Sequence, residues 1–143
     1  MVDLTIKIAA EKENVEKALD NLKDAMGRKE KSTIELAAIA TFLHNIYNGI
    51  ENILKQVLKA KGIEIPKSET SHKDLLELSV SNGIIPVKLS DQLYEYLTFR
   101  HFFVHSYGFM LEHTHLQDLS ENILNVWLQF ISAVESKAAD STS

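Results

Sequence analysis

The scarcity of helix-breaking residues is the feature that most constrains what this chain can fold into. The 143 residues include 5 glycines and 2 prolines. These stand at Gly27, Gly49, Gly62, Pro66, Gly83, Pro86 and Gly108. Because glycine and proline mark most turns and loops, long stretches without them favour long helices joined by short connections. We therefore expect an all-α fold.

Apolar residues between these breakers recur every three or four positions, which is the spacing of one helix face. The expected helices run from about Thr5 or Glu11 to Met26, from Ser32 or Thr33 to just before Gly62, from about Ser71 to Val80, from a cap at Ser90 to Tyr107, and from about His115 to Lys137. Residues 2–8 also alternate apolar and polar side chains, so a short N-terminal strand is an alternative for that segment. The pattern predicts an antiparallel bundle of four to five helices.

Length and composition fit one ordinary globular domain. Hydrophobic residues make up 45% of the chain and charged residues 24%, as in typical globular domains. We expect a single domain over residues 1–137 and a disordered tail over 138–143. No apolar run is long enough to span a bilayer and no signal-peptide pattern is visible, so no membrane partner is expected. The absence of cysteine excludes disulfides and cysteine nucleophiles, and it fits a reducing cytoplasm.

The charge of the chain argues against a general polyanion binder. The formal net charge is −5 at pH 7, and the basic residues between positions 12 and 31 alternate with acidic ones, which is typical of a solvated helix face. Any contact with RNA would have to be local and rely on a few Arg or Lys side chains.

The segment over residues 100–105 is the best candidate for a functional site. Arg100 and His105 stand five positions apart in a run that is otherwise mostly apolar and aromatic. Arginine has a permanent charge and a planar fork that suits phosphate oxygens, and histidine exchanges protons near neutral pH. Both groups are costly to bury without a partner. Phosphodiester chemistry is one reason for such a segment to hold them.

Structural roles are the alternatives for these residues. Arg100 could form a buried ion pair with Glu95, Glu112 or Glu51. His105 and Tyr107 could make hydrogen bonds in the core or at an interface.

Residues elsewhere have equally open interpretations. Glu51 is either a solvated edge of its helix or an ion-pair partner that orients Arg100. His72 is expected at the start of its helix, near the backbone, and His44 in the core or at its rim. His101 and His105 have the four-residue spacing of zinc ligands, but no glutamate lies between them and cysteine is absent, so we expect no metal site.

The helix that carries Arg100 has two apolar faces. On a helical wheel, one side gathers Leu93, Tyr96, Leu97, Val104 and Tyr107 around Arg100. Phe99, Phe102 and Phe103 fall on the other side. Such a helix is either central in a monomer or packed against both its own core and a partner. We expect a twofold homodimer through this helix, which would bring two copies of Arg100 and His105 together.

Three stretches of the chain resemble the HepT-like proteins of the HEPN superfamily. Residues 99–107, FRHFFVHSY, resemble the R-x4-H-x-Y motif of that family. Residues 47–55, YNGIENILK, resemble its Y-x-G-I-E-x-I-L-K signature, and residues 71–76, SHKDLL, resemble a third stretch where a histidine precedes paired leucines. The resemblance extends from about Ser32 to Val134 and implies a dimeric, HEPN-like helical bundle.

The resemblance also implies a function. Several family members are ribonuclease toxins encoded beside a minimal nucleotidyltransferase antitoxin. By this resemblance the chain is an endoribonuclease that needs no metal or cofactor and leaves 2′,3′-cyclic phosphates. Arg100 and His105 match the catalytic pair: Arg100 would hold the phosphate and His105 would act as general base or acid, at the dimer interface. His101 and Glu51 would be auxiliary residues.

Two further points follow from the family pattern. Tyr107 matches the tyrosine that the partner enzyme adenylylates in some toxin–antitoxin pairs. Where many family members have a polar residue such as asparagine after the arginine, this chain has His101. The alternative function is therefore a non-catalytic HEPN subunit that binds a nucleotidyltransferase partner, nucleic acid or a nucleotide.

Overall fold

A computed structural model of the chain describes residues 3–28, 32–104 and 113–142. Within these ranges the chain forms five α-helices and no strand. They are α1 (Leu4–Met26), α2 (Thr33–Ala60), α3 (Ser71–Ser81), α4 (Val87–Val104) and α5 (His113–Thr142). The expectation of an all-helical fold is confirmed.

The N-terminal strand considered above is wrong, and a helix cap explains why. The carboxylate of Asp3 accepts a hydrogen bond from the backbone N–H of Thr5 at 3.1 Å. This bond satisfies one of the free N–H groups at the start of α1, so the helix begins at Leu4.

The start of α2 agrees with the sequence and the start of α4 does not. Ser32 caps α2 through a capping box with Glu35. In α4 the expected cap at Ser90 is wrong, because the backbone N–H of Ser90 already donates to the carbonyl of Pro86 at 3.1 Å. The helix begins at Val87, directly after a proline, a residue that is well tolerated at helix starts.

Helix α5 also differs at its end. It continues to Thr142, beyond the end expected at Lys137, and the disordered tail over 138–143 stays a prediction. Ala138 and Ala139 are strong helix formers, which favours this continuation. None of the helices within the described ranges is both long and apolar enough to cross a membrane.

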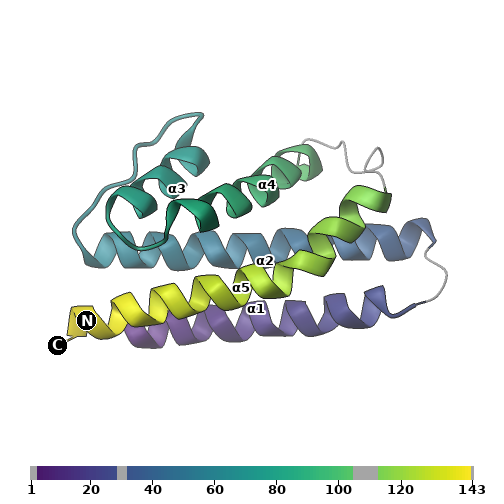
Figure 1. The fold of residues 1–143 in the computed structure, drawn as a ribbon, viewed down its shortest axis with the longest axis horizontal. Helices are drawn as coiled ribbons and strands as arrows, with labels where there is room; N and C mark the ends of the chain where they lie inside the picture. Colours follow the sequence, from purple (N-terminus) through teal and green to yellow (C-terminus); the bar gives the residue numbers. More distant parts are fainter. Residues whose placement is uncertain (1–2, 29–31, 105–112, 143) are drawn as a thin grey trace.

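Helix α2 is the centre of the bundle and contacts all four other helices. In Figure 1, α3 and α4 lie along one side of α2 and α1 along the other, while α5 runs obliquely across α2. The start of α1 and the end of α5 lie at the same end of the bundle. This arrangement places the residues of α2 between two different sets of neighbours.

The core is built from the inward faces of all five helices. Its largest fully buried side chains include Tyr47 of α2, Tyr96 and Phe99 of α4, and Trp127 and Phe130 of α5. The Tyr96 hydroxyl donates a hydrogen bond to the carbonyl of Leu119 at 2.7 Å, which ties α4 to α5. These contacts hold α4, and therefore Arg100, in a fixed position relative to α2.

Glycine at position 49 allows α1 to approach α2 closely. A Cβ atom at this position would lie 2.3 Å from Cγ2 of Val15, well inside van der Waals contact. A larger residue there would force the Val15 side chain to turn or α1 to move away from α2.

Helix α4 is apolar on its inward face, where Leu89, Leu93, Tyr96 and Phe99 are buried. On its outward side, Tyr94 is 47% exposed and Phe102 is 44% exposed. Within a single chain nearly half of each of these two aromatic residues therefore remains exposed to solvent.

Candidate functional site

An open cleft of about 380 Å³ lies between α3 and α4. Its lining residues are Glu69, Thr70, His72, Lys73, Tyr94, Leu97, Thr98, Arg100, His101 and Phe102. The cleft brings Arg100 and His101, both expected from the sequence, together with His72 and Lys73 of α3. Arginine, lysine and histidine side chains gathered in one cleft can bind an anion such as a phosphate.

Arg100 is held by an amide of α2. Its Nε donates a hydrogen bond to Oδ1 of Asn48 at 3.2 Å. Among the residues that the structure describes, no salt bridge joins Arg100 to Glu51 or Glu95, and Glu112 lies outside them. The bond to Asn48 uses only Nε, and no other described residue binds the two terminal NH₂ groups of the guanidinium, so these groups can bind a ligand in the cleft.

The same amide connects Arg100 to His44. Nδ2 of Asn48 lies 3.0 Å from Nε2 of His44. Because a guanidinium can only donate, the amide oxygen must face Arg100 and the NH₂ group must face His44. Nε2 of His44 therefore accepts this hydrogen bond and carries no proton.

The electrostatics of His44 agree with this assignment. Partial burial lowers the pKa of His44, and the positive charge of Arg100 lowers it further, while the charge of Glu51 opposes the shift. The ring also packs on Phe103, with 5.0 Å between the ring centroids. His44 is thus half-buried at the rim of the core, in agreement with the sequence, and is neutral near pH 7.

Glu51 is a buried carboxylate that contacts His72. It is 2% exposed, and its two oxygens lie 2.8 and 3.0 Å from Nδ1 of His72. The interpretation of Glu51 as a solvated edge is therefore wrong. Its contact is with His72 and not with Arg100. His72 does lie at the start of α3, as expected, but its partner is this side chain and not the backbone.

Tyr47 lies one helical turn before Glu51 and is fully buried. Burial raises the pKa of its hydroxyl, and the negative charge of Glu51 raises it further. The hydroxyl forms no hydrogen bond of ordinary geometry with any described residue. Tyr47 therefore remains protonated and neutral beside the carboxylate.

His105 and Tyr107, the expected catalytic histidine and adenylylation site, lie outside the described residues. The described part of the chain contains no group of three or more histidine, aspartate or glutamate side chains that could hold a metal ion.

Sequence reasoning missed the role of Asn48 and the contact of His72. A signal for the first was present: His44, Asn48 and Glu51 are spaced by four and three residues, so they share one face of a largely apolar helix. For His72 there was no comparable signal, because its partner lies 21 positions away on another helix.

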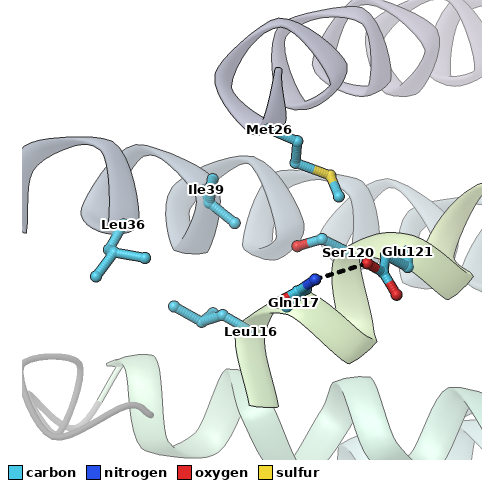
Figure 2. A pocket seen from close by; sticks show the side chains of 7 residues that line it. All are labelled: Met26, Leu36, Ile39, Leu116, Gln117, Ser120 and Glu121. Atoms are coloured by element: carbon cyan, nitrogen blue, oxygen red, sulfur yellow. Dashed lines mark hydrogen bonds between the residues drawn. The ribbon is translucent and has the colours of Figure 1, made fainter. Parts of the chain in front are cut away.

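A second, smaller cavity lies between α1, α2 and α5. Figure 2 shows Met26, Leu36 and Ile39 around it, with Ser120 and Glu121 on α5. Its volume is about 100 Å³, and the Ser120 hydroxyl beside it has no hydrogen-bond partner among the described residues. Among the residues that the structure describes, no cationic side chain lines this cavity, so the cleft beside Arg100 is the better candidate for a functional site.

The sequence of the chain matches a known protein family, and its fold matches solved structures. Residues 38–140 match the family model described as HepT-like protein. A crystal structure of a toxin–antitoxin with AMP-PNP superposes with a TM-score of 0.80 at 18% identity, over 90% of this chain and 97% of that chain. A mutant of the toxin–antitoxin MntA–HpeT gives a TM-score of 0.76 at 19% identity, with the same coverage. No curated protein sequence matches the chain. Because the family model spans well over half of its length, the chain belongs to the HepT-like protein family.

Proposed function

We propose that the chain is the toxin of a toxin–antitoxin pair and cuts RNA at a metal-independent site formed around Arg100 and His105. Membership of the HepT-like family supports this proposal, as does the fold shared with two structures described as toxin–antitoxin. The observation that carries it is the cleft in which the anchored guanidinium of Arg100 stands beside His72, Lys73 and His101.

The proposed reaction uses the ribose 2′-hydroxyl as nucleophile. Arg100 binds the phosphate and stabilises the negative charge that grows on its oxygens in the transition state. His105 takes or gives a proton at that phosphorus. The fixed bond to Asn48 means that the guanidinium does not have to reorganise during the reaction.

A homodimer through α4 would complete the site. Tyr94 and Phe102 are aromatic side chains that a single chain leaves 47% and 44% exposed, and large aromatic groups are enriched at interfaces. Both also line the cleft, so a second copy on this face would bring its own Arg100 close by.

The proposed partner is a minimal nucleotidyltransferase that silences the toxin by adenylylating Tyr107. This tyrosine lies seven residues after Arg100 in the sequence. An added nucleotide would bring negative charge and bulk to the site and compete with RNA for Arg100. Mass spectrometry after incubation with the partner and ATP should find the adenylate on Tyr107, and Tyr107→Phe should escape silencing. Adenylate on another residue, or on none, would contradict this.

Cleavage of a set of RNAs by purified protein tests the central proposal. Arg100→Ala should reduce the cleavage rate by about 10²–10³-fold, because it removes the group that stabilises the transition state. EDTA should have no effect. Arg28→Ala is the matched control, since this arginine lies on the surface in an exposed ion pair with Asp24 and should leave cleavage unchanged.

Three outcomes would overturn the proposal: cleavage that survives Arg100→Ala, cleavage that stops with EDTA, or cleavage of RNA whose 2′-hydroxyls are methylated. If the clean protein cuts no RNA, the alternative is a non-catalytic subunit that binds a nucleotidyltransferase or nucleic acid. The net charge of −5 and His101 in place of the common polar residue favour that alternative.

A further inference from the structure

We infer that His72, held by the buried carboxylate of Glu51, is a second proton-transfer group of the cleft and acts as the general acid in RNA cleavage. The inference rests on the proposed ribonuclease function and adds a residue to it. The geometry that points to it is the pairing of a buried carboxylate with a histidine that reaches into the cleft of Arg100.

The contact with Glu51 determines which ring nitrogen of His72 is bound to protein and which is left for a ligand. A carboxylate can only accept, so Nδ1 of His72 must carry a hydrogen and donate it to Glu51. The His72 side chain is 34% exposed and lines the cleft. Within the described ranges no residue forms a hydrogen bond with Nε2. This nitrogen is therefore the one that can exchange a proton with a ligand in the cleft.

The burial of Glu51 is costly for a purely structural role. A carboxylate that is 2% exposed has lost nearly all contact with water, and a buried ion pair is often no more stable than apolar side chains of similar volume. Ile50 and Leu54 beside it on α2 are fully buried, so an apolar residue would fit this environment. The contact with Glu51 does fix the tautomer and the orientation of the His72 ring. The buried aspartate of a Ser-His-Asp triad fixes its histidine in the same way.

The charges that act on His72 come from three helices. The titratable and charged groups around it are Tyr47 and Glu51 of α2, Glu69 just before α3, Lys73 of α3, and Tyr94, Arg100 and His101 of α4. Glu51 is the one in direct contact, through both of its carboxylate oxygens.

Cleavage of RNA needs two proton transfers that one neutral histidine cannot perform at the same time. The 2′-oxygen loses its proton to His105 as the new 2′-O–P bond forms. The P–O5′ bond breaks, its electron pair leaves with the 5′-oxygen, and Nε2 of the His72 imidazolium gives that oxygen its proton. Arg100 stabilises the charge on the non-bridging oxygens meanwhile. Exchange with water then returns the proton to His72 and removes the proton from His105.

The test uses His72→Asn, because an asparagine amide can still donate to Glu51 but cannot transfer a proton. Two substrates are compared: ordinary RNA, and the same RNA with sulfur in place of the 5′-oxygen at the cleaved bond. A 5′-thiolate leaves without protonation, so it needs no general acid. Binding is measured separately with RNA whose 2′-hydroxyls are methylated.

His72→Asn should cut ordinary RNA about 10²–10⁴-fold more slowly than wild type but cut the 5′-sulfur RNA at the wild-type rate. Its affinity for the methylated RNA should be unchanged, and its pH–rate profile should lose the fall in rate at alkaline pH that reports the acid. His105→Asn is the matched control. It should remain defective on both substrates because the 2′-hydroxyl still needs a base.

The outcomes separate this inference from the function on which it rests. Equal cleavage of ordinary RNA by His72→Asn and wild type overturns the inference and leaves the ribonuclease in place. An equal loss on both substrates also overturns it, because His72 would then support the structure and not donate a proton. Wild-type protein that cuts neither substrate overturns the ribonuclease function and the inference together.

Discussion

The two sides of helix α2 meet their neighbours in opposite ways. Toward α1, Gly49 lets the Val15 side chain come so close that no Cβ would fit. Toward α3 and α4, the neighbouring positions carry Asn48 and Glu51, whose polar groups bind Arg100 and His72. On the α1 side, the size of the residue in α2 is limited by the space available. On the side of α3 and α4, the residue in α2 must supply a polar group that can form the right hydrogen bond. One helix thus separates the packing that stabilises the bundle from the contacts that position the candidate site.

The largest effect should come from adding volume on the α1 side. Gly49→Ala places a methyl group 2.3 Å from Cγ2 of Val15, and overpacking of this kind costs about 1–3 kcal/mol, which should exceed the helix propensity gained from alanine. Urea unfolding should show a lower free energy of unfolding, while RNA binding by the remaining folded protein is unchanged.

A double variant sharpens this prediction. Val15→Ala makes room for the new methyl group, so the two substitutions together should cost less than the sum of the two single effects. If Gly49→Ala were as stable as wild type, the close approach of α1 and α2 would not be what requires glycine here.

A smaller effect on stability is expected on the α4 side. Asn48→Ala leaves Nε of Arg100 and Nε2 of His44 without their partner, at a cost of about 1–2 kcal/mol. Asn48→Asp can still accept from Arg100 but cannot donate to His44, so it should raise the pKa of His44 by favouring a proton on Nε2. NMR titration of His44 measures this directly.

If the chain acts on RNA as proposed, Asn48→Ala should bind methylated RNA more weakly than wild type, because Arg100 loses the acceptor that holds it. Asn48→Asp keeps that acceptor but adds a negative charge beside Arg100, which opposes binding of a phosphate. Unchanged RNA binding, together with an unchanged His44 pKa in Asn48→Asp, would show that the amide does not connect the two side chains in solution.

The smallest effect concerns pH. In the folded protein the pKa of His44 is lowered from its ordinary value of 6.5, so the unfolded chain binds this proton more readily. Stability should therefore fall as pH drops through 6.5, by at most about 1.4 kcal/mol per pH unit for one proton. His44→Gln should remove this part of the pH dependence, and the difference between the two unfolding curves measures it. If the stability of both proteins changed with pH in the same way, the lowered pKa of His44 would be contradicted.

The sequence was most informative where local chemistry decides the structure. The cap at Ser32 could be identified from nearby residues, because a hydroxyl three positions before a glutamate completes a capping box. At Ser90 the same reasoning failed, because a capping serine and a helix that begins after Pro86 both satisfy local rules. The alternative of an N-terminal strand was wrong for a related reason. The apolar residues within 2–8 fit both the two-residue period of a strand and the 3.6-residue period of a helix, and the cap by Asp3 favours the helix.

The candidate site was only partly predictable for a different reason. Helical periodicity places Asn48 and Glu51 on one face of α2, and it places Arg100 on one side of α4. It does not say which helix packs against which. The bond from Arg100 to Asn48 spans 52 positions and that from His72 to Glu51 spans 21, so both depend on how the helices pack. The buried state of Glu51 in particular follows from the position of α3, which no local pattern determines.

The burial of Trp127 gives the chain its own optical probe. It is the single tryptophan of the sequence, it is 1% exposed, and its ring lies 5.9 Å from that of Phe130. An indole shielded from water emits at shorter wavelength than one in solvent, so loss of the core should shift its fluorescence to the red. Trp127 does not line the cleft, so a ligand bound beside Arg100 should leave this emission unchanged, and occupancy and unfolding can be followed separately in the same sample.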